Sequence, residues 1–72
     1  MDFYSYLSDI FSEDVQEDSI LKSFESYDSY SLLEIISMVE TYYGKSINGN
    51  DIRKYNTAKE LYDYVVSLPK EK

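Results

Sequence analysis

Apolar residues recur three and four positions apart in three segments of this 72-residue chain, and that spacing is typical of one face of an α-helix. The three segments are 3–11, 29–43 and 57–68. A short helical turn is expected at 51–55, and no segment alternates strongly enough to predict a strand. The sequence therefore predicts an all-α fold in a single domain covering residues 1–72. This fold would be a small bundle of three main helices plus one short helix, with a long first loop.

Residues that commonly begin or end helices flank these segments. Ser29 or Ser31 can cap the second helix, and Glu34 follows Ser31 at the spacing of a capping box. Gly44 stands where that helix should end, because glycine readily takes the left-handed conformation that closes a helix. The other predicted starts are Asp2 for the first helix and Thr57, boxed with Glu60, for the last. The expected core positions are Phe3, Tyr6, Leu7, Ile10 and Phe11, then Leu32, Ile36, Val39 and Tyr43 flanked by Ile35 and Tyr42, then Leu61, Tyr64, Val65 and Leu68, with Ile20, Leu21 and Phe24 anchoring the loop.

The composition excludes several functional classes. The chain has no Cys and no His, so it lacks thiolate nucleophiles, zinc-finger ligands and the commonest general base. Fourteen acids stand against seven bases, which argues against nucleic-acid binding. The acidic residues Asp14, Glu17 and Asp18 lack the spacing of a calcium loop, so no metal site is expected. We therefore expect a protein that is not itself an enzyme.

Charge is distributed unevenly along the chain. Residues 1–40 hold ten acids and one base, whereas residues 41–72 hold four acids and six bases. The acidic half can steer a basic partner, or it can simply keep a small protein soluble. No apolar run is long enough to span a membrane, and the acidic N-terminus is unlike a signal peptide. A cytoplasmic monomer is expected.

The second helix has more apolar positions than a core stripe needs. Tyr30, Leu33 and Met38 lie off the predicted stripe, beside Glu34 and Ser37. Extra apolar surface next to polar residues indicates a docking face for a partner. In the alternative reading, Leu33 packs beneath the long loop and Met38 packs against the first or last helix.

One stretch resembles a known family. The sequence Asp-Ser-Tyr-Ser-Leu-Leu-Glu-Ile-Ile at 28–36 is similar to the centre of an acyl carrier protein or peptidyl carrier domain. That family has an Asp-Ser-Leu motif followed by a Glu five residues after the Ser, which is the position of Glu34. The resemblance continues without gaps over residues 26–68, through Gly44, Ile47, Thr57, Leu61, Tyr64 and Val65. The sequence departs from the family in lacking a Gly shortly before Ser29, in placing Tyr30 where Leu is usual, and in having a shorter first helix and loop.

The resemblance implies a carrier. A phosphopantetheinyl transferase would attach phosphopantetheine, taken from coenzyme A, to the hydroxyl of Ser29. Asp28 would help to present that serine. The arm would hold an acyl or aminoacyl thioester for the enzymes that load and transfer it, without contact with nucleic acid or membrane. The docking face would comprise Tyr30, Leu33, Glu34, Ser37 and Met38, and the residues able to shelter a cargo would be Leu32, Ile36, Ile47, Leu61 and Val65.

Other interpretations stay open. Ser29 preceded by an acid is also the ordinary pattern of a helix cap. The chain would then be an unmodified, carrier-like interaction module that binds a protein through its second helix. A third possibility is an unrelated acidic bundle that inhibits a basic partner. Whether a carried group is fatty acyl, polyketide or an amino acid is left open by the sequence.

Overall fold

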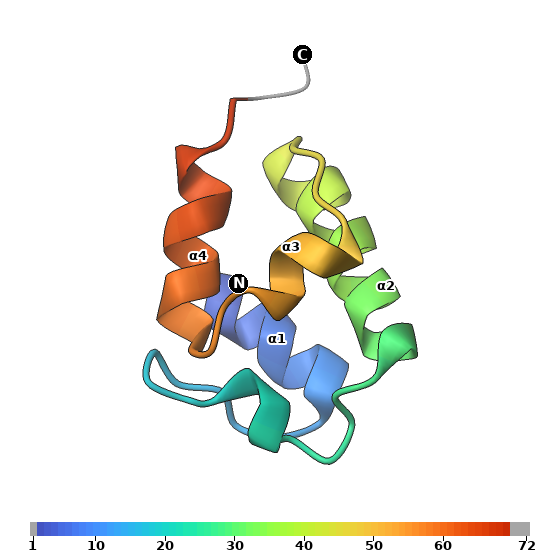
Figure 1. Cartoon of the computed structure of the whole chain (residues 1–72), viewed down its shortest axis with the longest axis vertical. Helices are drawn as coiled ribbons and strands as arrows, with labels where there is room; N and C mark the ends of the chain where they lie inside the picture. Colours follow the sequence, from blue (N-terminus) through green and yellow to red (C-terminus); the bar gives the residue numbers. More distant parts are fainter. Residues whose placement is uncertain (1, 70–72) are drawn as a thin grey trace.

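The computed structural model describes residues 2–69 of the chain. This part contains four α-helices joined by loops (Figure 1). A 3₁₀ turn at Leu21–Ser23 interrupts the first loop, and α2 continues into π-helical turns at Val39–Tyr43. The helices are α1 at Phe3–Phe11, α2 at Ser29–Met38, α3 at Gly49–Arg53 and α4 at Ala58–Ser67. The fold is therefore all-α within the described residues. None of these helices is both long enough and apolar enough to cross a membrane.

Local capping explains where the helices begin. Asp2 accepts a hydrogen bond from the backbone amide of Ser5, and Thr57 forms a reciprocal capping box with Glu60, both as the sequence predicts. The short helix α3 begins two residues earlier than predicted, because Asn48 caps it in a second box with Asp51.

The second helix also ends where the sequence predicts. The π-helical turns carry the chain to Tyr43, so the helical segment has the predicted bounds although its hydrogen bonding changes after Met38. Gly44 then adopts a φ of 66°, and its amide donates to the carbonyl of Glu40 at 3.2 Å. A residue with a Cβ is strained in this left-handed conformation, so the glycine ends the helix.

The buried face of the second helix differs in part from the predicted stripe. Ile36 and Tyr43 are only partly buried. Since α2 packs on α1 at one side and on α3 at the other, its buried face is wider than a single stripe. It extends toward α1 as far as Met38, so the alternative reading of Met38 as packed against a neighbouring helix is confirmed and its place on an exposed docking face is wrong. The buried apolar residues here are Leu32, Ile35, Met38 and Val39.

The rest of the core closes around α1. Phe3 packs edge-on against Tyr43 and tilted against Tyr62 of α4. The buried apolar residues outside α2 and its continuation are Phe3, Leu7, Phe11, Val15, Leu21, Ile47, Ile52, Ala58, Leu61 and Val65.

Hydrogen bonds hold the first loop, residues 12–28, against the start of α4. The amide of Leu21 donates to the carbonyl of Asn56 at 2.8 Å, and the amide of Ala58 donates to the carbonyl of Ser19 at 3.0 Å. Leu21 is buried and Phe24 stacks on Phe11 with ring centres 5.0 Å apart, as expected of anchors. The prediction is wrong for Ile20, whose side chain is 47% exposed because this residue contributes backbone pairing instead. Val15 is buried in its place.

Candidate functional site

The start of α2 is built by a reciprocal pair, Asp28 and Ser31. A carboxylate oxygen of Asp28 accepts from the amide of Ser31 at 2.9 Å, and the Ser31 hydroxyl accepts from the amide of Asp28 at 3.0 Å. The Ser31 hydroxyl also donates to the Asp28 carbonyl at 2.9 Å. Asp28 is thus the cap, and the predicted cap at Ser29 or Ser31 with Glu34 is wrong. The physical reason is that an acid preceding the helix takes the cap position itself.

This arrangement leaves Ser29 without a structural task. It is the first residue of α2, its side chain is exposed, and its hydroxyl forms no hydrogen bond within residues 2–69. The amides of Ser29 and Tyr30 are likewise unpartnered in that range, as expected for the first turn of a helix. An accessible hydroxyl therefore lies beside two free donors, at the end of a helix whose dipole favours negative charge.

Four of the five residues predicted to form a docking face do reach the surface. Tyr30 is 72% exposed and Leu33 is 62% exposed, one helical turn from Ser29. Ser37 is exposed and Glu34 is partly exposed. Met38 is only 6% exposed, so its assignment to an exposed face is wrong. At 100° per residue it lies on the opposite side of α2 from Ser29, toward α1.

Tyr27, two residues before Ser29, is partly buried and was not among the expected site residues. Its ring stacks on Phe11 with centres 6.3 Å apart, and its hydroxyl is buried without a hydrogen-bond partner in the described residues. Burial raises the pKa of this phenol, and the nearby charge of Arg53 opposes that shift. The only signal in the sequence was the crowding of tyrosines around Ser29.

The residues expected to shelter a cargo form part of the closed core. Leu61 and Val65 of α4 are fully buried, and Leu32 and Ile47 nearly so. Ile36 is partly buried. The four buried residues belong to the one core cluster, and Ile36 packs against it.

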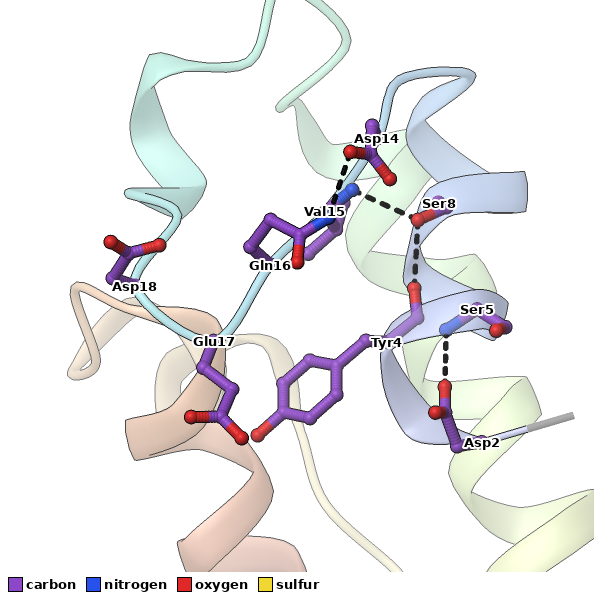
Figure 2. Close-up of a pocket in the computed structure, with 9 residues that line it drawn as sticks. All are labelled: Asp2, Tyr4, Ser5, Ser8, Asp14, Val15, Gln16, Glu17 and Asp18. Carbon is purple, nitrogen blue, oxygen red and sulfur yellow. Dashed lines mark hydrogen bonds between the residues drawn. The ribbon is translucent and has the colours of Figure 1, made fainter.

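A separate acidic pocket lies between α1 and the first loop (Figure 2). The Ser8 hydroxyl joins the two, donating to the carbonyl of Tyr4 and accepting from the amide of Val15, each at 2.9 Å. Figure 2 shows the Tyr4 ring pointing toward Glu17. Burial and then the charges of Glu17 and Asp63 raise the pKa of the Tyr4 hydroxyl. Within residues 2–69, no three acidic side chains are placed to hold a metal ion.

The functional candidate is therefore Ser29 with its capping pair and the exposed face of α2. No protein-family model matches the chain, and neither a curated protein nor a solved structure matches it. The site is thus defined by the geometry of this chain's own residues.

Proposed function

We propose that this chain is a carrier protein whose Ser29 hydroxyl accepts phosphopantetheine from coenzyme A. The observation that carries the proposal is that Asp28 and Ser31 cap α2 whereas Ser29 takes no part in the cap. Asp28 and Ser31 make the whole cap, and Ser29 between them stays exposed with its hydroxyl unbonded in the described part of the chain. A serine needed only as a cap would bond its own helix.

The order of elements supports the same proposal. After Ser29 come a glycine-terminated helix, a buried Ile47 in the next loop, a short helix and a Thr57-capped last helix. Each follows at the spacing on which the resemblance to acyl and peptidyl carriers depends. The proposal places the protein in the cytoplasm as a carrier that is not itself an enzyme.

The chain's own residues fit a phosphate ester at this position. The amides of Ser29 and Tyr30 and the dipole of α2 stabilise an exposed anion there by about 0.3–1 kcal/mol. The chain has no His, and one carboxylate oxygen of Asp28 is occupied by the Ser31 amide. A separate phosphopantetheinyl transferase would therefore supply the base that takes the Ser29 proton, while the serine oxygen forms the new bond to phosphorus and adenosine 3′,5′-bisphosphate leaves coenzyme A. When bound, the group supplies a thiol that holds an acyl or aminoacyl thioester.

The exposed face of α2 supports a second candidate function. Tyr30 and Leu33 present apolar surface beside Ser29, with Glu34 and Ser37 next to them. In a carrier, this face meets the transferase and the loading enzymes. In an unmodified interaction module, binding a partner protein through this same face would be the whole function.

Intact mass spectrometry separates the two. The protein is incubated with coenzyme A, Mg²⁺ and a transferase of broad specificity, beside Ser29→Ala and the control Ser46→Ala, which changes an exposed serine outside α2. We expect the parent and Ser46→Ala to gain one phosphopantetheine and Ser29→Ala to gain none. Unchanged masses with several transferases would replace the carrier proposal by the interaction module.

A further inference from the structure

A groove runs between α1 and the second helix, on the opposite side of α2 from Ser29. Its apolar lining comes from Tyr6 and Ile10 of α1 and from Met38 and Tyr42. The rings of Tyr6 and Tyr42 stack with centres 4.5 Å apart and planes 18° apart, although Tyr42 is 60% exposed. Large aromatic surface is thus held in place at the edge of the groove while remaining open to solvent.

Two carboxylates, Asp9 and Glu34, also line the groove, one from each helix. Neither forms a hydrogen bond or ion pair within residues 2–69. The ion pairs found there, Lys54–Asp51 and Lys59–Asp63, both lie in the second half of the chain. The first forty residues contain a single base, Lys22. The groove therefore combines apolar surface with negative charge that the described residues do not neutralise.

The size of the groove limits what it can hold. Its volume of about 310 Å³ lies at the lower end of the range for ligand pockets. That space fits one or two side chains projecting from a partner. An amphipathic helix supplies such side chains at i, i+3 and i+4, with flanking positions free for charge.

We propose that the α1–α2 groove binds a basic amphipathic helix of a partner protein. Apolar side chains of that helix enter beside Tyr6, Met38 and Tyr42. Its Lys or Arg residues lie against Asp9 and Glu34, where a cation of the partner replaces the missing counter-charge.

The groove shares Glu34 and Ser37 with the exposed face of α2 but does not include Ser29. At 100° per residue, Ser29 lies on the opposite side of α2 from Met38, so an occupant of the groove does not cover the serine itself. A partner in the groove would compete with any protein that also contacts Glu34 and Ser37. Binding in the groove does not require Ser29 to be modified.

Fluorescence polarisation of a labelled synthetic peptide tests the proposal with the full chain. The peptide is an amphipathic helix of Leu and Lys, and its control is a scrambled peptide of the same composition without an apolar face. We expect the amphipathic peptide to bind about tenfold more tightly than the scrambled one. Ser29→Ala should bind like the parent, so this result is independent of the carrier assay.

Variants assign the binding to the groove. Asp9→Asn combined with Glu34→Gln should weaken binding about three- to tenfold and reduce its salt dependence. Tyr42→Ala should weaken binding without changing the salt dependence. The matched control, Glu25→Gln with Glu40→Gln, removes the same charge at exposed positions outside the groove and should leave the affinity near that of the parent. Circular dichroism verifies that each variant is folded.

Three outcomes would overturn the proposal. Equal affinity for the scrambled peptide would reduce the effect to general attraction between opposite charges. Equal loss in the Glu25 and Glu40 control would place the binding elsewhere on the acidic half. A dimer of the free protein that Tyr42→Ala dissociates would make a second copy the occupant.

Discussion

Two serines at the start of α2 differ in what their hydroxyls do. Ser31 is buried and its hydroxyl bonds both the amide and the carbonyl of Asp28. Ser29 is exposed and makes no such bond within the described residues. The same side chain is therefore structural at one position and available for chemistry two residues earlier.

Replacing each serine by alanine should separate these roles. Ser31→Ala removes a buried hydroxyl that satisfies the Asp28 amide, so we expect the free energy of unfolding to fall by about 1–2 kcal/mol. Ser29→Ala should change it by less than about 0.5 kcal/mol, as for other exposed substitutions. Urea denaturation followed by circular dichroism measures both. Equal losses in the two variants would mean that Ser29 also supports the fold.

The sequence predicted part of the site at this scale. The exposure of Tyr30 and Leu33 follows from helical spacing. The choice of Asp28 and Ser29 rests instead on the resemblance to carrier proteins. For Met38 the spacing left two readings open, because a single periodic stripe cannot show that α2 packs on both α1 and α3. The buried hydroxyl of Tyr27 was also out of reach, since loop residues have no periodicity to read.

Helix boundaries could be predicted where a side chain bonds the free backbone amides of the first turn, or where a glycine closes the last turn. Asp2, Gly44 and the Thr57–Glu60 box all act as their sequence indicates. The Glu60 carboxylate accepts from the amides of Asn56 and Thr57, and these bonds lower its pKa. The start of α3 was missed because Asn-Gly-Asn is typical of turns, whereas here the first Asn caps a helix.

The two glycines should respond oppositely to alanine. Gly44→Ala places a Cβ on a residue with a φ of 66°, so we expect a loss of about 1–2 kcal/mol even though nothing lies within 4 Å of the new atom. At Gly49, the first residue of α3, the new Cβ would meet Leu32 of α2 at 3.9 Å, an ordinary van der Waals contact between the two helices. Gly49→Ala should therefore be neutral or stabilise by up to about 1 kcal/mol. Thermal unfolding of the pair tests this, and a stable Gly44→Ala variant would contradict the assigned role of the left-handed cap.

Across the whole molecule, repulsion between the many carboxylates opposes the packing of the helices. The chain has a net charge of −7, and both ion pairs found in residues 2–69 lie outside the acidic half. Asp9 of α1 and Glu34 of α2 line the same groove, and neither forms an ion pair within those residues. Aromatic contacts of Phe3 with Tyr43 and Tyr62 hold α1 against the end of the second helix and against α4 despite that repulsion.

Added salt should stabilise the protein. Raising NaCl from about 10 mM to about 150 mM shortens the screening length from about 30 Å to about 8 Å. Like-charge neighbours cost about 0.2–0.5 kcal/mol each, so relieving a few should raise the melting temperature by about 3–5 °C. Asp9→Asn with Glu34→Gln should reduce this rise, and differential scanning calorimetry measures it. A melting temperature that does not depend on salt would show that the repulsion is unimportant.

The hydrogen bonds between the first loop and the start of α4 have a consequence for biosynthesis. They join Ser19 and Leu21 to Ala58 and Asn56, residues that lie more than thirty positions later in the chain. A ribosome that has made only the first fifty residues has already produced Ser29, but not the partners that order the loop in front of it. That loop reaches its final form only when the start of α4 has been synthesised, so a modifying enzyme that recognises the ordered loop would act only after α4 has left the ribosome.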